Sequence, residues 1–174
     1  MSRDRCLTER EKGFWLAFIE ASHLIERMLD QRLRAETGLT YGQYEILMRL
    51  ASAPGRKMRM SELADQAVTT RSGLTYQVSQ LEKSGLVSRR AYPGDERGVL
   101  AHLTPAGQVL LDKLIPVQEA VVSEYLTGQL SAEQLDALAA AMCATRRHLR
   151  GQPSEGAAPV SCPGDAARGE PPHA

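Results

Sequence analysis

Hydrophobic residues recur every three or four positions over much of the chain, a spacing typical of helices with one buried face. The first such segment runs from about Glu11 to Ala35 and is followed by Gly38. Glycine readily adopts the left-handed conformation that often ends a helix, so we predict that the first helix stops there. Its hydrophobic stripe consists of Phe14, Phe18, Ala21, Ile25 and Met28.

Side chains that can cap helices mark where further helices begin. Thr40 and Gln43 form a capping box, in which the hydroxyl accepts a hydrogen bond from the backbone three residues on and the amide reaches back. Ser61 is placed to cap a short third helix. Ser131 and Gln134 repeat the capping box before a last helix that extends to about residue 149. We therefore expect a largely helical protein.

A fourth helix, predicted from about Arg71 to Ser84, has two chemically different faces. Its hydrophobic residues, spaced four and three apart, form one narrow inward stripe, and Gly85 follows as the predicted stop. The opposite face carries hydroxyl, amide and amino groups. The inward stripe consists of Leu74, Val78 and Leu81.

Two short runs of β type follow the fourth helix, at residues 86–91 and 99–103. The residues between them contain Pro93 and Gly94, a pair that favours a tight turn, so we predict a hairpin with a polar tip. The next helix is long and hydrophobic, begins after Thr104 as its N-cap and extends to about residue 126.

Composition divides the chain into three parts. Residues 151–174 contain nine glycines and prolines among 24 positions, and we predict a disordered tail because so little hydrophobic surface cannot offset the entropy of ordering. Residues 1–10 are mostly polar and are expected to be a flexible arm. One domain remains, at residues 11–150. No hydrophobic run is long enough to cross a bilayer or to act as a signal peptide, so we expect a cytoplasmic protein without a membrane partner.

Several classes of protein are excluded by the cysteines, histidines and glycines. Cys6, Cys143 and Cys162 are odd in number and widely spaced, which argues against a disulfide framework. The four histidines have no metal-ligand spacing, so we expect neither a metal nor another cofactor. The chain also lacks a nucleophile–histidine–acid arrangement and a phosphate-binding glycine loop, and we predict that it is not an enzyme.

Charge is balanced over the whole chain, with 21 Lys and Arg against 21 Asp and Glu, but it is segregated locally. Residues 56–97 contain eight basic and five acidic residues, a net charge of +3, so the remainder carries −3. The same segment holds a short helix, a polar-faced helix and a hairpin, in the order of a helix–turn–helix with a wing. In such domains the second helix enters the major groove of DNA. The basic residues are Arg56, Lys57, Arg59, Arg71, Lys83, Arg89, Arg90 and Arg97.

Five short segments in this order and spacing resemble the MarR family of transcriptional regulators. The resemblance covers about residues 12–149 and is densest over 39–107. It implies a mainly α fold with a small β-hairpin wing, that is, a winged helix-turn-helix with a helical dimerisation layer. The matching segments are Leu39–Leu47, Ser61–Ala64, Ser72–Thr75, Leu81–Val87, and Asp95–Gly98 leading to Leu103–Gly107.

What the resemblance implies for function is a homodimeric regulator of palindromic operators in double-stranded DNA, by family habit a repressor. The DNA-binding lobe would span about residues 39–107, and the dimerisation helices about residues 11–36 and 105–149. The family's recognition-helix surface corresponds here to Arg71, Ser72, Thr75, Tyr76, Ser79 and Gln80.

Further DNA contacts are predicted around this surface. Asp95 and Arg97 match the family's wing motif, in which the arginine enters the minor groove or contacts phosphate and the aspartate orients it. Arg89 and Arg90, on the ascending strand of the wing, are candidates for phosphate contacts, and Lys83 on the polar face of the fourth helix is a further candidate for DNA binding. The alternative for all of these side chains is an ordinary solvated surface, with Asp95 and Arg97 as a simple ion pair.

Relatives of this family often release DNA when a small aromatic or phenolic acid binds. Five residues correspond by position to such an effector pocket, although an aromatic residue at helical spacing is also typical of a core. These residues are Trp15, Ile19, His23, Tyr41 and Met48. A second hypothesis for the whole chain is a winged-helix module that binds another protein and has no sequence-specific DNA binding.

Overall fold

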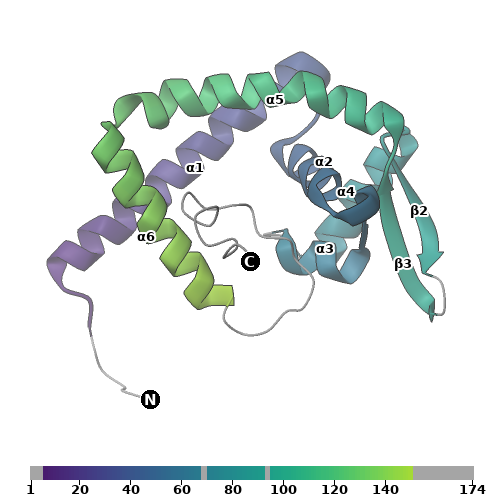
Figure 1. Cartoon of the computed structure of the whole chain (residues 1–174), viewed down its shortest axis with the longest axis horizontal. Coiled ribbons are helices and arrows are strands. Elements are labelled where there is room, and N and C mark those ends of the chain that lie inside the picture. The colour runs from purple at the N-terminus through teal and green to yellow at the C-terminus, as the bar shows by residue number, and fades with distance from the viewer. Residues whose placement is uncertain (1–5, 68–69, 93–94, 151–174) are drawn as a thin grey trace, which may run out of the picture.

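The computed structural model describes residues 6–67, 70–92 and 95–150, apart from the side chains of Arg71, Arg150 and residues 95–97. Helices account for most of these residues, and a small sheet lies at one end of the molecule (Figure 1). The elements are α1 (Glu9–Thr37), α2 (Tyr41–Ser52), β1 (Lys57–Arg59), α3 (Met60–Gln66), α4 (Arg71–Lys83), β2 (Val87–Tyr92), β3 (Asp95–Leu103), α5 (Pro105–Tyr125) and α6 (Ala132–Arg150), with 3₁₀ turns at Pro54–Arg56 and Thr127–Gln129.

The predicted ends of the first helix are close to the observed ones. Gly38 ends α1 with a φ of 77°, as its left-handed preference predicts. The helix begins at Glu9, two residues inside the segment assigned to a flexible arm, because Thr8 and Glu11 form a capping box that the sequence reading missed. Residues 1–5 and the predicted disordered tail at 151–174 lie outside the described residues.

The capping box before α2 is confirmed. The backbone N–H of Gln43 donates to the hydroxyl of Thr40 at 3.1 Å, and the N–H of Thr40 donates to the amide oxygen of Gln43 at 3.0 Å. The predicted cap of α3 is wrong, because α3 begins at Met60 and Ser61 lies inside it. The three residues before α3 form β1, a strand that the sequence pattern did not predict.

The sheet has three antiparallel strands in the order β1-β3-β2, so the predicted hairpin is present and gains a third strand. In the register, His102 of β3 lies between Lys57 of β1 and Ser88 of β2. The mainly α architecture with a small wing is confirmed. Strand β1 was missed because three residues are too few for an alternating pattern to stand out.

A buried core joins α2, α4, the sheet and α5. The predicted inward residues of α4, Leu74, Val78 and Leu81, are all fully buried. Tyr44 of α2 is buried as well, and its hydroxyl donates to the side chain of Gln118 on α5. Burial raises the pKa of Tyr44 to about 12, so this hydroxyl keeps its proton at neutral pH. The inward side of α4 is therefore packed closely against the core.

Helix α5 leads away from the sheet alongside α1, where Glu124 near its far end lies 4.0 Å from Arg32, and α6 folds back from that end (Figure 1). Thr104 caps α5, its hydroxyl accepting from Gly107 at 3.0 Å, as predicted. Cys143, on α6, is half-buried and disulfide-bonded. Within the described ranges, no helix is both long and hydrophobic enough to cross a membrane.

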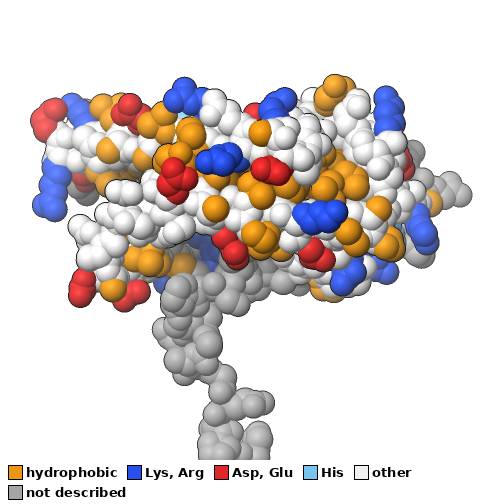
Figure 2. Space-filling view, turned by 90° about the horizontal axis from the view of Figure 1, so that it is seen from above, with side chains coloured by type: hydrophobic (Ala, Val, Ile, Leu, Met, Phe, Trp, Pro, Cys, Tyr) orange, Lys and Arg blue, Asp and Glu red, His pale blue; other side chains and the backbone are white. Residues whose placement is uncertain are grey.

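The hydrophobic stripe of α1 is buried at one end only. Its C-terminal members, Ile25 and Met28, pack against the core. Toward the N-terminus, Phe14 is 59% exposed, Trp15 52% and Phe18 40%. The space-filling view from above shows hydrophobic side chains open to solvent on the face that holds α5 (Figure 2). The part of the molecule away from the sheet thus presents large hydrophobic groups that a single chain leaves uncovered.

Candidate nucleic-acid interface

The outward face of α4 is the centre of the candidate site. Because α4 buries Leu74, Val78 and Leu81 in the core, the 100° turn per residue directs the intervening polar side chains outward. Ser72, Thr75, Tyr76 and Lys83 are exposed, and Ser79 and Gln80 are half-buried. The structure thus brings together on one face six of the residues predicted for the recognition surface and its flank. The side chain of Arg71 lies outside the described part of the chain.

The start of α4 is held by its own cap. The hydroxyl of Thr70 accepts a hydrogen bond from the backbone N–H of Gly73 at 3.1 Å and lies 3.2 Å from the hydroxyl of Ser72. A side-chain cap of this kind satisfies a backbone donor that the first turn leaves free. The exposed hydroxyl of Ser72 is therefore presented from an ordered helix start.

Arg89, predicted to contact phosphate, is engaged with another residue of the chain. Its backbone N–H donates to Oε1 of Glu82 at 3.0 Å, and its Nε donates to Oε2 at 2.7 Å. These hydrogen bonds hold the pKa of Glu82 below its usual value, so the carboxylate stays charged at neutral pH. The pair connects the last turn of α4 to the first residues of β2 and fixes the helix relative to the wing.

Arg90 is the next residue along β2, and its side chain is exposed. Adjacent residues of a strand point to opposite faces of the sheet, which explains why Arg90 does not share the partner of Arg89. Near the far end of β2, the guanidinium of Arg59 lies 3.6 Å from the centre of the Tyr92 ring. The predicted wing-tip pair, Asp95 and Arg97, belongs to β3, but both side chains lie outside the described part.

His102 lies on the same face of the sheet as Lys57 and Arg90. Burial lowers the pKa of His102, and the positive charges of Arg90 and Lys57 lower it further. The imidazole is therefore neutral at neutral pH, and its buried Nε2 has no hydrogen-bond partner among the described residues. The positive charge of this face comes from the lysine and arginine rather than from the histidine.

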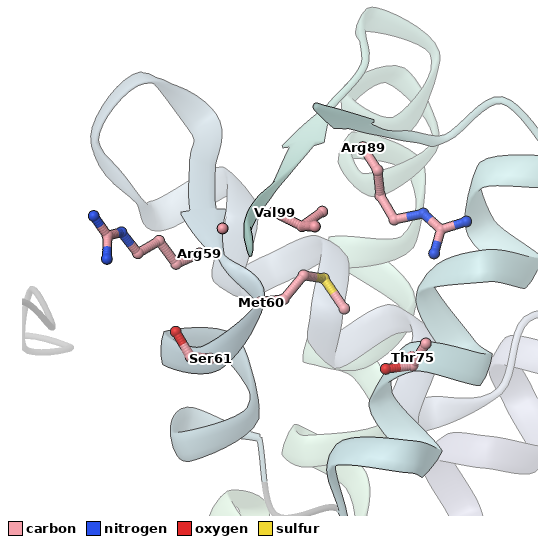
Figure 3. Close-up of a pocket in the computed structure, with 7 residues that line it drawn as sticks. Arg59, Met60, Ser61, Thr75, Arg89 and Val99 are labelled. Carbon is pink, nitrogen blue, oxygen red and sulfur yellow. The ribbon is translucent and has the colours of Figure 1, made fainter. Parts of the chain in front are cut away.

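A hollow of about 330 Å³ opens between α4, the start of α3 and the sheet. Met60, Val99 and Thr75 point into it, whereas the guanidinium of Arg59 points away (Figure 3). Its walls combine hydrophobic side chains with hydroxyl groups, and the guanidinium of Arg89 beside it is held by Glu82. The lining residues are Arg59, Met60, Ser61, Thr75, Arg89, Gly98 and Val99.

Within a single chain, the five residues predicted for an effector pocket do not lie close together. The N–H of Tyr41 donates to Asp30 at 2.9 Å, which puts Tyr41 beside the C-terminal part of α1. Trp15 is fifteen residues before Asp30 on α1. At a rise of 1.5 Å per residue, it therefore lies about 22 Å from Asp30. Trp15 and His23 are exposed, Ile19 is half-buried, and Tyr41 and Met48 pack against the core.

Sequence reasoning missed the interactions that hold the site together. Glu82 was counted only as one acidic residue among five, although it orients Arg89, and Arg59 only as one positive charge. The stacking of Arg59 on Tyr92 depends on the pairing of β1 with the sheet, and β1 is the strand that was not predicted. A signal for Glu82 did exist, because Glu82 and Arg89 flank Gly85, where the chain reverses from helix to strand.

The arrangement can bind a long polyanion with a readable edge. An exposed helix with a polar face has a diameter of about 10–12 Å, which fits the major groove of DNA at a width of about 12 Å, and a hairpin beside it can follow the backbone. Exposed cations are supplied by Lys83 in the last turn of α4 and by Arg90 on β2. Charge would give affinity, and the neutral polar groups would distinguish bases.

Comparison with known proteins gives the same family by three routes. The model of the MarR family matches residues 39–99. The transcriptional regulator HosA of Escherichia coli O111:H- is 34% identical over 96 residues, 55% of this chain and 69% of its own length. These relatives are transcriptional regulators rather than enzymes.

Solved structures extend the similarity beyond the DNA-binding lobe. Sco3205, a MarR family transcriptional regulator from Streptomyces coelicolor in complex with DNA, is 37% identical, with a TM-score of 0.78, over 90% of this chain and 96% of its own. AbsC, another MarR family regulator from Streptomyces coelicolor, is 35% identical, with a TM-score of 0.75, over 86% of this chain and all of its own. The similarity therefore includes the helices outside the lobe.

Proposed function

The chain belongs to the MarR family of transcriptional regulators, and from that premise we propose that it is a homodimeric repressor of palindromic operators, released by a small-molecule effector. The observation that carries the proposal is the exposed polar face of α4, held beside a positively charged wing. In the proposed complex the DNA-binding lobe spans about residues 39–107. Its site of action is the cytoplasm, because such a regulator must reach chromosomal DNA.

Base recognition is assigned to α4 in this proposal, and backbone contacts are assigned mainly to the wing. Ser72, Thr75, Ser79 and Gln80 supply hydrogen-bonding groups for base edges, and the amide of Gln80 suits the paired donor and acceptor of adenine. Lys83 and Arg90 contact phosphates. The wing-tip pair, Asp95 and Arg97, is proposed to reach the minor groove. Sco3205, the similar regulator described above, was crystallised with DNA, which supports this mode of binding.

Dimerisation is assigned to α1, α5 and α6, at about residues 11–36 and 105–149. The support is the exposed aromatic group of Phe14, Trp15 and Phe18, since such large hydrophobic surfaces typically mark an interface. Phe18→Glu is expected to convert a dimer into a monomer, measured by light scattering or sedimentation. Ser52→Glu, at an exposed position at the end of α2, is the matched control and should leave the mass unchanged. A Phe18→Glu protein with the mass of the wild type would contradict this assignment.

Effector release is proposed to act where the dimerisation helices meet the lobe. Trp15, Ile19 and His23 would come from one chain, and Tyr41 and Met48 from the other, because a single chain keeps Trp15 far from Tyr41. A small aromatic acid would then bridge the chains and change the distance between the two α4 helices. Titration of such acids against the protein–DNA complex tests this part separately.

The alternative, a winged-helix module that binds a protein, makes a different prediction about salt. Selection of bound duplexes from a random pool, followed by a salt titration, separates the two hypotheses. The repressor should enrich a two-fold symmetric site, with log K falling steeply against log salt because phosphate contacts release counterions. A folded dimer that enriches no duplex would favour the protein-binding module.

A further inference from the structure

Tyr76 is the largest hydrophobic group on the outward face of α4. Its side chain is 62% exposed, and the other exposed positions of this face carry hydroxyl or amino groups without a ring. It is two residues, or about 200°, from the buried Leu74, so it projects almost directly away from the core. Ser72 is one turn before it, and Lys83 is two turns after it. An aromatic ring therefore stands near the centre of the surface proposed to enter the major groove.

The chemistry of this ring restricts what it can recognise. Base edges in the major groove consist of hydrogen-bond donors and acceptors, with one apolar exception, the 5-methyl group of thymine. The ring of Tyr76 gains contact with that methyl group, whereas its hydroxyl can hydrogen-bond to the edge of any base, so the preference for thymine comes from the ring. Recognition of guanine commonly uses arginine or lysine, and Lys83, the cation among the described side chains of α4, is in its last turn.

The hydroxyl groups around Tyr76 are consistent with an A·T pair at this point. Ser72 and Ser79 are short and can accept or donate, and Gln80 can pair with adenine in the way that amides do. Short side chains on either side also leave room for the ring to reach the floor of the groove. Longer cationic neighbours would instead direct this part of the helix toward phosphates.

We infer that Tyr76 is a specificity-determining residue that reads the 5-methyl group of a thymine in each half of the operator. The inference rests on the proposed function, since it assumes that α4 enters the major groove. It adds the class of base that the helix prefers and the side chain that confers the preference. The same chemistry would accept a 5-methylcytosine, and the experiment below separates the two sources of the methyl group.

The test removes one methyl group at a time from DNA. In a duplex enriched from the random pool, each thymine is replaced in turn by deoxyuridine, which keeps base pairing and lacks only the 5-methyl group. For the wild-type full chain, one symmetric position should lose about fourfold in affinity per half-site, the effect of burying one methyl group. Tyr76→Ala should bind the thymine and uracil duplexes equally at that position.

The other source of the methyl group, 5-methylcytosine, is tested by replacing the A·T pair there by G·5-methyl-C. Tighter binding to that duplex than to the thymine duplex would overturn the assignment to thymine.

Two variants separate the ring from other causes of lost affinity. Tyr76→Phe keeps the ring and should keep the uracil penalty. Lys83→Ala removes a charge from the same face and should weaken binding to all duplexes while keeping the penalty. An enriched palindrome with no sensitive thymine, or an equal penalty in Tyr76→Ala, would overturn the inference and leave the proposed function standing. Failure to enrich any duplex would overturn both.

Discussion

Glu82 and Arg89 connect the recognition helix to the wing across the turn at Gly85. Oε2 of Glu82 lies 2.7 Å from Nε and 2.6 Å from Nη2 of Arg89, and Oε1 accepts from the Arg89 backbone N–H at 3.0 Å. Both oxygens of the carboxylate are used, on the side chain and the backbone of one residue. Such paired, charge-assisted hydrogen bonds set the relative orientation of the two elements as well as holding them together.

The first prediction concerns the pH dependence of this connection. The hydrogen bonds from Arg89 lower the pKa of Glu82 in the folded protein, so folding is favoured by the charged carboxylate above the pKa of an unfolded glutamate. This contribution is lost as pH falls through the lower, folded pKa. Glu82→Gln should therefore be less stable than the wild type at pH 7, and the difference should shrink below pH of about 4.

Urea unfolding at pH 7 and at pH 3, at one fixed protein concentration, measures this difference. Asp65→Asn, which removes a carboxylate from an exposed position of α3, is the matched control. A stability difference between wild type and Glu82→Gln that is the same at both pH values would show that the charge of Glu82 does not contribute.

The second prediction concerns Gly107, where α5 passes close to the turn before β2. A Cβ atom at this position would lie 2.2 Å from the carbonyl oxygen of Leu86 and 2.7 Å from Cδ1 of Leu103. Because one obstacle is backbone, relaxation would have to move α5 or the start of β2. Gly107→Ala should lower the free energy of unfolding by about 1–3 kcal/mol, the usual cost of overpacking.

Gly13→Ala provides the contrasting glycine in the same experiment. Gly13 is in α1, and a Cβ atom there would meet nothing within 4 Å. Alanine is the better helix former, so this change should raise the free energy of unfolding by up to about 1 kcal/mol. Equal effects of the two substitutions would show that the close approach at Gly107 is not what matters.

Local signals in the sequence were sufficient for most of the fold. Gly38 and Gly85 both adopt positive φ, as their positions after helices predict, and Thr40 and Thr104 cap the helices they precede. Each of these features depends on a few neighbouring residues, so a linear reading can detect it. The inward stripe of α4 was predicted for the same reason, since its spacing is set by one helix.

Features that depend on distant residues could not be predicted in this way. Strand β1 exists because Lys57, Met58 and Arg59 pair with β3, more than 40 positions later. The ion pair between Arg89 and Glu82 is another such feature, since predicting it requires knowing how α4 meets β2. The exposure of Phe14 and Phe18 is a third case, because a hydrophobic stripe does not reveal whether its cover comes from the same chain or from another.

The third prediction concerns the joint between α1 and α2. Asp30 accepts hydrogen bonds from Nε of Arg34 at 2.5 Å and from the backbone N–H of Tyr41, the first residue of α2, at 2.9 Å. Burial acts to raise the pKa of Asp30, but these bonds outweigh it and the pKa is lowered. Asp30→Ala should lower the free energy of unfolding by about 1 kcal/mol, because it leaves a helix-start N–H without its acceptor.

Asp30→Asn keeps an acceptor oxygen and should lose less free energy of unfolding. Equal losses in the two variants would assign the effect to charge alone. Denaturant unfolding of the three proteins decides between these outcomes.

The last prediction separates two neighbouring arginines of the wing by their response to salt. The Arg90 side chain is exposed, so its proposed phosphate contact should appear as one fewer released counterion when it is removed. Arg90→Ala should weaken binding to enriched and unrelated duplexes in the same proportion and flatten the slope of log K against log salt by about one unit. Arg97→Ala should behave in the same way if the wing tip contacts DNA as proposed.

Arg89→Ala should instead lower protein stability and leave the slope close to that of the wild type, because Glu82 already neutralises its guanidinium. Fluorescence anisotropy over a series of salt concentrations measures all four proteins. Equal slopes for Arg89→Ala and Arg90→Ala would mean that DNA draws Arg89 away from Glu82.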